Sequence, residues 1–195
     1  MDSSARKQKN QERIRGEILA TAQQILKKEG IFEVTMRRVA KEMGYSPGSL
    51  YNYFKDKDEI LTAIYTATCQ DFLQKMQRVY VDGDDPKNSF IELMCFMCEF
   101  RIKNAYRYRE ILQNVMPGQE IEELLAIRRY VAEKLAGLGL KGLKNEEDLR
   151  IANRTLLAVA EGLASLYAGN VNKATIQECR GIMKKAVRAL LKGWK

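Results

Sequence analysis

Histidine is absent from this chain of 195 residues. It is the side chain that proteins use most often as a general base near neutral pH, and it is also the commonest metal ligand. Its absence argues against most hydrolytic and zinc-dependent chemistries. The sequence also lacks a nucleotide-binding glycine loop and a paired-carboxylate motif, so we expect no catalytic residue, no cofactor and no metal site.

Long apolar stretches are missing as well. No run approaches the ~20 apolar residues that a membrane-spanning helix needs. The first residues, MDSSARKQKNQERIR, lack the apolar segment of a signal peptide. We therefore expect a cytoplasmic protein without a membrane partner. The four cysteines lie scattered through helical patterns, and in the cytoplasm we expect them to be reduced thiols.

Basic residues outnumber acidic ones, and the excess is largest near the N-terminus. The net charge of +8 favours a polyanionic partner without naming it. Residues 1–57 hold 12 basic and 7 acidic side chains, whereas the rest of the chain holds 21 and 18. The basic surplus therefore lies mainly in the first third of the chain.

Apolar residues recur at helical spacing along the whole chain, without strict alternation, so the sequence predicts an all-α protein. A stripe that starts at Ile14 marks a first helix, which ends before Gly30. Asp56 and Glu59 have the spacing of a capping box and begin a long helix that runs to about Met76. Later helices are predicted over about residues 85–104, 106–115, 120–135, 145–168 and 175–191.

Two short helices are expected between these longer ones, over about residues 35–42 and 46–54. Gly44 ends the first of them, while Ser46 provides an N-cap for the second and Pro47 occupies its first helical position. Two short helices joined by a glycine-containing turn and packed on a longer preceding helix form a helix-turn-helix arrangement. In such an arrangement the second short helix enters the major groove of DNA.

The segment from Thr35 to Leu61 reads TMRRVAKEMGYSPGSLYNYFKDKDEIL, and it closely resembles the DNA-binding signature of the TetR family. Thr35, Ala40 and Gly44 stand where that family begins its second helix, packs it against the third and makes the turn. The family's recognition-helix pattern is matched by Ser46, Gly48, Leu50, Tyr51, Tyr53, Phe54, Lys57 and Asp58, although a glutamate is more usual at the last position. The specific resemblance covers roughly residues 11–61, and the later helices match the family only in number and order.

The resemblance implies two domains. Residues 1–56 would form an N-terminal arm and a three-helix helix-turn-helix DNA-binding domain, and residues 57–195 a larger helical domain for effector binding and dimerisation. Leu50 and Phe54 are expected to point inward. The residues expected to contact double-stranded operator DNA are Thr35, Arg37, Ser46, Pro47, Gly48, Ser49, Tyr51, Asn52, Tyr53 and Lys57.

Two parts of this DNA-binding interpretation have alternatives. Taken alone, the pair Tyr51 and Tyr53 would more often pack against a core than contact DNA, and only the surrounding match reverses that preference. A basic tail is ordinarily solvated charge, but beside a helix-turn-helix it is better explained by contacts to the DNA backbone or minor groove. The cations of this tail are Arg6, Lys7, Lys9, Arg13 and Arg15.

A Cys-x-x-Cys pair, Cys95 and Cys98, falls in the middle of a predicted helix. A structural zinc site needs four ligands, and the sequence offers neither a second such pair nor a histidine. Cysteine and methionine are ordinary soft packing residues, so we interpret these thiols as part of the core. A thiol sensor of redox state is the alternative.

The helix that contains these cysteines is apolar around most of its circumference and must be largely buried. In the TetR family an internal pocket lies among the central helices, and methionine-rich walls suit apolar or amphipathic ligands of variable shape. The residues expected to bind a small-molecule effector are Phe90, Met94, Met97 and Phe100. A solid core without a pocket is equally compatible with this pattern.

The last two helices, over residues 145–191, carry apolar and small residues on more than one face. The resemblance implies that they form a four-helix bundle with a second copy of the chain, and packing within one chain is the alternative. We expect a ligand-responsive transcriptional regulator that binds a palindromic operator as a homodimer, a repressor released by its effector. The alternatives are a helical carrier or sensor of hydrophobic molecules that does not bind DNA, and an all-helical enzyme.

Overall fold

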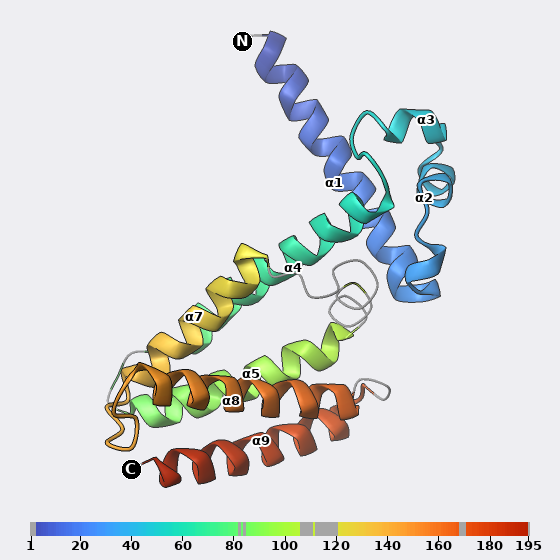
Figure 1. Ribbon diagram of the computed structural model, residues 1–195. Helices are drawn as coiled ribbons and strands as arrows, with labels where there is room; N and C mark the ends of the chain where they lie inside the picture. The colour runs from blue at the N-terminus through green and yellow to red at the C-terminus, as the bar shows by residue number, and fades with distance from the viewer. Residues whose placement is uncertain are drawn as a thin grey trace. The chain divides into compact units, whose positions relative to one another are not determined.

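The computed structural model describes residues 3–81, 83, 85–105, 111, 121–167 and 171–194 (Figure 1). Every regular element in these residues is helical, which confirms the all-α prediction for the part of the chain described. Contacts divide the chain into two compact units: unit 1 contains Met1–Thr68 and Tyr106–Gln119, and unit 2 contains Cys69–Ala105 and Glu120–Lys195. None of the helices searched among the described residues is long and apolar enough to cross a membrane.

Unit 1 is built from one long helix and two short ones. Its elements are α1 (Ser3–Glu29), the 3₁₀ turn η1 (Ile31–Glu33), α2 (Met36–Met43), α3 (Pro47–Leu50) and the first part of α4 (Lys57–Val79). The second half of α1 supplies the apolar stripe predicted from the sequence, and α2 contacts both α1 and α3. The buried side chains of this unit include Ile14, Ile18, Ala22, Ile25, Leu26, Val39, Ala40, Leu50, Phe54, Ile60, Leu61 and Ile64.

Side-chain caps fix where the short helices begin. The Thr35 hydroxyl accepts a hydrogen bond from the Arg38 amide at 3.1 Å, and the Ser46 hydroxyl accepts one from the Ser49 amide at 3.3 Å. Such caps satisfy amides that have no partner within the helix. Between the two helices Gly44 adopts φ 71°, a left-handed conformation that glycine reaches without steric cost. The predicted helix-turn-helix is confirmed down to these local features.

The first helix begins much earlier than the sequence pattern predicted. The apolar stripe placed its start near Ile14, with an arm before it, whereas α1 starts at Ser3. The added turns are rich in good helix formers and bury no apolar face, so hydrophobic periodicity does not detect them. Arg13 pairs with Glu17 one turn further on, a spacing that supports an exposed helix.

The second short helix is shorter than predicted. The pattern extended it to Phe54, but α3 ends at Leu50 and residues 51–53 form a turn. The Tyr53 amide donates to the Leu50 carbonyl oxygen at 2.9 Å, a tighter bond than the α-helical one, and the Phe54 amide donates to the same oxygen at 3.0 Å. The turn therefore closes the helix while it still brings Phe54 back to the core.

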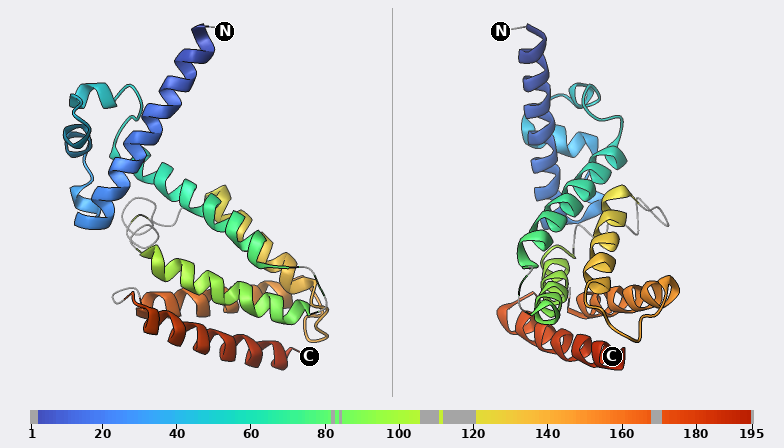
Figure 2. Two further views of the ribbon diagram at one scale, coloured as in Figure 1. Left: turned by 180° about the vertical axis from the view of Figure 1, so that it is seen from behind. Right: turned by 90° about the vertical axis from the view of Figure 1, so that its left-hand side faces the viewer.

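Unit 2 is arranged around one buried helix. Its elements are the second part of α4, α5 (Pro86–Lys103), α7 (Glu122–Ala136), α8 (Glu146–Tyr167) and α9 (Lys173–Gly193). α5 packs against both α8 and α9, which run alongside it (Figure 2). Nine of its side chains are buried: Phe90, Ile91, Leu93, Met94, Cys95, Met97, Cys98, Phe100 and Ile102. The predicted burial of this helix is confirmed.

Ion pairs surround the apolar contact between α5 and α9. The Arg180 guanidinium of α9 pairs with Glu92 and Glu99 of α5, and the Lys184 ammonium pairs with Glu92 at 2.7 Å. These acids lie seven residues apart on α5, so one face of the helix presents both to the same neighbour. A further pair, Arg101 with Glu161, joins α5 to α8.

The loop between α7 and α8 is joined to the C-terminal end of α9. The Gly142 amide donates to the Trp194 carbonyl oxygen at 2.8 Å. A β-carbon at residue 142 would lie 2.7 Å from that oxygen, so the close approach of the two backbones requires glycine here. The hydrogen bond closes one end of unit 2.

Two further sequence expectations concern the helix over residues 106–115 and the boundary between the two domains. The helix expected over residues 106–115 lies outside the described residues, except for Ile111. The sequence placed a domain boundary between residues 56 and 57, whereas unit 1 extends to Thr68 and includes the first part of α4. Buried Ile60 and Leu61 account for that extension.

All four cysteines are buried and none forms a disulfide. Cys98 interacts with Cys179 of α9, and the Cys95 thiol donates to the Arg180 carbonyl oxygen at 3.7 Å. Burial raises the pKa of the Cys95 thiol to about 11, and burial together with Cys179 raises the pKa of Cys98 still further. No three acidic or cysteine side chains converge as metal ligands in the described residues.

These thiols should be unreactive in the folded protein. At pH 8 a pKa near 11 instead of 9.0 leaves about a hundredfold less thiolate, so Cys95 should react with iodoacetamide at least that much more slowly than in the unfolded chain. The stabilisation from the protonated thiol is complete below pH 9 and is lost as the pH rises through 11, because only the unfolded chain ionises in that range. Mass spectrometry of labelled protein measures the first effect.

Labelling of the native protein at the rate of the denatured protein would contradict this account. Stoichiometric zinc in protein purified without added metal would also contradict it. A third contradicting result would be an oxidant that releases the protein from DNA, if this effect disappears when Cys95 and Cys98 are replaced by serine.

Candidate DNA-binding surface

The residues around α3 divide into an inward set and an outward set. Leu50 and Phe54 are each only 1% exposed, which confirms that they anchor the segment in the core of unit 1. Ser46, Pro47 and Gly48 are exposed before and along the helix. The exposed residues from Ser46 to Gly48 therefore form a short edge along α3, and the buried side chains of Leu50 and Phe54 fix it to the core of unit 1.

Arg15 of α1 attaches this edge to the rest of unit 1. Its guanidinium donates a hydrogen bond to the Tyr53 carbonyl oxygen and lies 4.0 Å from the centre of the Phe54 ring. It also lies 3.5 Å from Glu59, whose carboxylate accepts a hydrogen bond from the Lys55 amide at 2.6 Å. Arg15 was grouped with the basic tail as a DNA contact, but the structure gives its guanidinium three partners within the chain.

Gly48 is the most informative residue on this edge. A β-carbon built at this position would meet nothing closer than the Ser46 hydroxyl oxygen, 4.0 Å away, and the glycine does not adopt a positive φ. Neither packing nor backbone conformation within the chain therefore requires a glycine. An external partner that approaches the backbone closely would require one.

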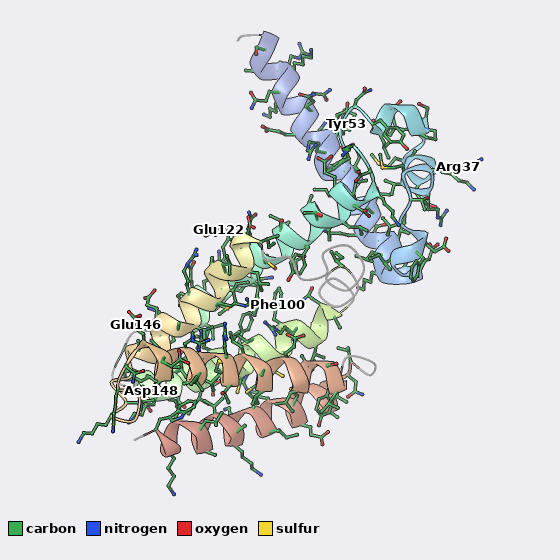
Figure 3. All side chains as sticks on the ribbon, in the orientation of Figure 1. Arg37, Tyr53, Phe100, Glu122, Glu146 and Asp148 are labelled. Carbon is green, nitrogen blue, oxygen red and sulfur yellow. The ribbon has the colours of Figure 1, made fainter. Side chains whose placement is uncertain are left out.

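The turn after α3 exposes two polar side chains. Tyr51 is 57% exposed although it is aromatic, and Asn52 is also exposed. Tyr53 is half-buried beside α1, and its carbonyl oxygen receives Arg15 (Figure 3). Ser49 is half-buried too, and its hydroxyl is 2.8 Å from that of Ser46. Of the two tyrosines, Tyr51 is the one whose ring is mainly free of the core.

The remaining predicted contacts lie at the starts of α2 and α4. Thr35 caps α2, and Arg37 extends from α2 into solvent (Figure 3). Arg38, its neighbour, instead pairs with Glu29 at 3.0 Å and Glu42 at 2.6 Å. Lys57 is exposed at the first position of α4, where free amides and the helix dipole favour an anion.

Asp56 and Glu59 organise that start of α4. The Glu59 amide donates to the Asp56 carboxylate at 2.9 Å, which confirms the predicted N-cap. The Glu59 carboxylate accepts from the Lys55 amide rather than from that of Asp56, so the reciprocal bond of a capping box is displaced by one residue. The turn between α3 and α4 is thus fixed at both ends.

The four residues predicted to bind an effector are all buried in unit 2 on α5. The Phe100 ring stacks on the Phe72 ring of α4, with 4.5 Å between the ring centres and 12° between their planes (Figure 3). Phe90, Met94 and Met97 lie along a neighbouring face of the same helix. The described contacts are compatible with both interpretations of these residues, a ligand pocket and a solid core. The effector site therefore stays a prediction.

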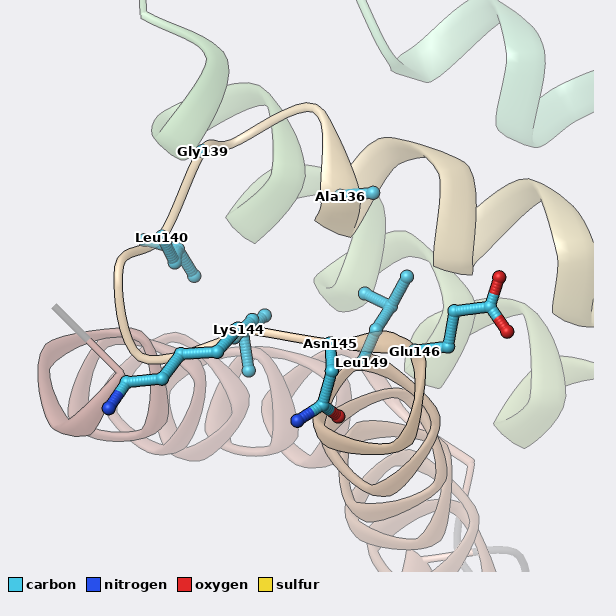
Figure 4. A pocket seen from close by; sticks show the side chains of 8 residues that line it. Ala136, Gly139, Leu140, Lys144, Asn145, Glu146 and Leu149 are labelled. Carbon is cyan, nitrogen blue, oxygen red and sulfur yellow. The ribbon is translucent and has the colours of Figure 1, made fainter.

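A separate pocket of about 290 Å³ lies where α7 passes into α8 (Figure 4). Ala136, Leu140 and Leu149 contribute apolar surface to it, and Lys144 and Glu146 lie on its polar side. No sequence pattern predicted this pocket, because its lining comes from a loop and two helix ends.

The geometry of unit 1 defines the class of protein. A capped helix, a left-handed glycine turn and a second capped helix with an exposed polar edge form a helix-turn-helix of the DNA-binding type. The family model for bacterial regulatory proteins of the tetR family matches residues 18–64. Together with the similarities below, this match supports a TetR-family regulator.

Curated relatives match up to about half of this chain. An HTH-type transcriptional regulator of Staphylococcus aureus is 26% identical over 83 residues, which is 43% of this chain and 45% of the relative. A second regulator so described, from another strain, is 25% identical over 97 residues, half of each chain. This chain therefore matches about half the length of these relatives.

Solved structures match nearly the whole chain in fold. A TetR-family transcriptional regulator from Pectobacterium atrosepticum has a TM-score of 0.71 and 17% identity, with 95% of each chain covered. The fatty acid degradation regulator FadR from Bacillus halodurans has a TM-score of 0.67 and 16% identity, covering 91% of this chain and 94% of that one. At such identities the likeness concerns the fold alone.

Proposed function

We propose that this protein is a ligand-responsive, DNA-binding transcriptional regulator that binds a palindromic operator as a homodimer. The open space at Gly48 is the observation that carries the DNA-binding part, since nothing within the chain requires a glycine there. In this proposal the edge around α3 enters the major groove, with Pro47, Gly48, Ser49 and Asn52 as candidate readers of base edges. Such a protein acts where the chromosome lies, in the cytoplasm.

Other residues would position the protein without reading sequence. Lys57 offers a charge at a helix N-terminus, and the exposed Tyr51 ring offers a hydroxyl at the edge of the groove. Thr35 and Arg37 would bind phosphate from the start of α2, and Ser46 and Tyr53 would support the segment between them. Phosphate contacts fix orientation on the duplex, whereas base contacts select the sequence.

Dimerisation is proposed through α8 and α9. Leu156 and Ala160 of α8 and Met183 of α9 are buried within the single chain. A different stripe remains uncovered on α8: Ile151, Ala158, Gly162 and Leu166 are all exposed and share one face. Small and apolar residues in one uncharged row suit the close approach of another helix, and Ile182 on α9 is partly exposed as well.

Effector control is proposed through α5. The buried residues Phe90, Met94, Met97 and Phe100 offer an apolar wall, and α5 contacts both helices assigned to the dimer. A ligand that separates these side chains would shift α8 and α9, and with them the spacing of the two DNA-binding units. A repressor released by an apolar or amphipathic effector fits this arrangement, and one structural neighbour is described as a regulator of fatty acid degradation.

A carrier or sensor of hydrophobic molecules that does not bind DNA is the second candidate. The buried apolar surface of α5 would serve it equally well. It gives no reason for the exposed polar edge of α3 or for the glycine at position 48. The same argument disfavours an enzyme.

Replacing Gly48 by alanine should separate DNA binding from folding. The fold has room for the added methyl group, so stability should be unchanged or higher by up to about 1 kcal/mol, because alanine is the better helix former. Operator affinity should fall at least tenfold, because the methyl group occupies the space of the DNA. Thermal unfolding and binding to the duplex upstream of the gene measure the two effects.

The matched control is Gly193→Ala, since Gly193 is also helical with nothing within 4 Å of its β-carbon position. It should leave DNA binding intact. Equal operator affinity for the Gly48 variant and the unaltered protein would remove the argument from Gly48.

The substitution Leu166→Asp should dissociate the dimer. Leu166 is 80% exposed in the single chain, so the fold tolerates a charge, but an unpaired carboxylate in an apolar interface is strongly destabilising. The matched control is Phe32→Asp, which changes a 79% exposed apolar residue of unit 1. Sedimentation equilibrium at micromolar concentration is the measurement. A monomeric unaltered protein would refute the homodimer.

Effector and operator should weaken each other's binding by the same factor. Linkage requires this reciprocity for any ligand that shifts one equilibrium between two states. Straight-chain carboxylic acids of increasing length serve as amphipathic probes, with binding measured by calorimetry in the presence and absence of operator. An acid that binds tightly and leaves operator affinity unchanged is not the effector. If every acid that binds behaves so, the model fails for this class.

A further inference from the structure

The pocket between the end of α7 and the start of α8 is formed by a loop whose backbone is held at several points (Figure 4). The Gly142 amide donates to the Trp194 carbonyl oxygen at 2.8 Å. The Lys144 amide donates to the Asp148 carboxylate at 3.0 Å, and the Asp148 amide donates to the Asn145 side-chain oxygen at 2.8 Å. Because these hydrogen bonds fix the loop, a ligand would find the pocket already formed.

The lining of this pocket is mainly apolar. Leu140 of the loop is buried, and Leu143 and Leu149 are half-buried. Ala136 contributes from the end of α7. These side chains border a hollow of about 290 Å³, whereas the side chains of a packed core leave few voids larger than a water molecule. A hollow of this size suits a molecule smaller than most drug-sized ligands.

Two exposed side chains of opposite charge border the apolar lining. Lys144 lies just before α8, and Glu146 is the first residue of that helix. Figure 4 shows these two side chains extending away from each other, so that their charged ends lie apart. Neither charged group forms an ion pair with another described residue, although the neighbouring Glu147 pairs with Arg150. Both charges are therefore available to a ligand.

We propose that this pocket binds a small zwitterion whose ammonium and carboxylate groups stand at opposite ends of a short apolar chain. The chain lies against the leucines, the carboxylate pairs with Lys144 and the ammonium pairs with Glu146. Because these two side chains diverge, a molecule with both charges at one end reaches only one of them. The site is separate from the α5 side chains expected to bind the effector, so the proposal goes beyond the proposed function.

The test measures binding to the full chain by calorimetry, without DNA. The probe is ε-aminohexanoic acid, while hexanoic acid and hexylamine each keep one of its two charges. The zwitterion should bind about fivefold more tightly than either, which is the upper end of the usual effect of one exposed ion pair. Its isomer norleucine carries both charges at one end and should bind no better than the singly charged probes.

Two variants assign the charges to their partners. Lys144→Gln should weaken ε-aminohexanoic acid about fivefold and leave hexylamine unaffected, and Glu146→Gln should weaken it equally and leave hexanoic acid unaffected. Both side chains are exposed, and Asp148 bonds the backbone amide of residue 144, so the fold should persist, as circular dichroism can check. The matched control is Lys141→Gln, an exposed lysine of the same loop that does not line the pocket. It should behave as the unaltered chain.

Three results would overturn the proposal. The first is that no probe binds the unaltered chain at millimolar concentration. The second is that norleucine binds as tightly as ε-aminohexanoic acid, because the separation of the two charges then has no role. The third is that the Lys144 and Glu146 variants bind ε-aminohexanoic acid as tightly as the unaltered chain, which would place the ligand elsewhere. None of these results concerns DNA binding, so the proposed function is tested separately.

Discussion

A helix of four residues cannot hold itself together in water, because the first turn costs more conformational entropy than its one hydrogen bond returns. The exposed edge around α3 therefore depends on the burial of Leu50 and Phe54, one at the end of α3 and the other just beyond the following turn. Arg15 adds a hydrogen bond to the backbone between them. Because these buried residues hold the segment in place, the exposed residues of α3 are not needed for folding. They are therefore available to contact a partner.

Unit 2 shows the same division between buried residues that hold the fold and exposed residues that are free to contact a partner. Among the described residues α5 is largely buried, so the surfaces it leaves to partners are those of the helices that cover it. Ala152, Leu156, Ala160 and Ala164 of α8 are buried, and a second row, from Ile151 to Leu166, is left uncovered. In the proposed function this arrangement places the effector site and the dimer interface on opposite sides of the same helices, and a change in one is transmitted by packing to the other.

The cysteines illustrate how a local pattern can mislead. Cys95 and Cys98 form a Cys-x-x-Cys pair in the sequence, yet the partner of the Cys98 thiol is Cys179, some eighty residues away. On a helix, residues three apart share a face but point outward from the axis, and here that face meets α9. Burial confirms the interpretation of Cys95 and Cys98 as core thiols. Which thiol lies next to Cys98 depends on the helix that covers α5.

Much of the fold followed from the sequence because the signals were local. Helix periodicity, the caps at Thr35, Ser46 and Asp56, and the glycine at position 44 act within a few residues, so they predicted the helix-turn-helix and its inward side chains. The TetR-family resemblance rested on the same segment. Periodicity failed at Ser3–Arg13, because a helix that buries nothing has no apolar stripe to detect.

Contacts between residues distant along the chain could not be predicted in this way. The role of Arg15 depends on the carbonyl oxygen of Tyr53, 38 residues later. Which apolar residues of α8 stay exposed depends on where α5 and α9 lie. Local spacing along the chain was enough to predict where helices form and which class of surface they present. Their partners were decided by packing, because contact between distant residues is a property of the folded chain as a whole.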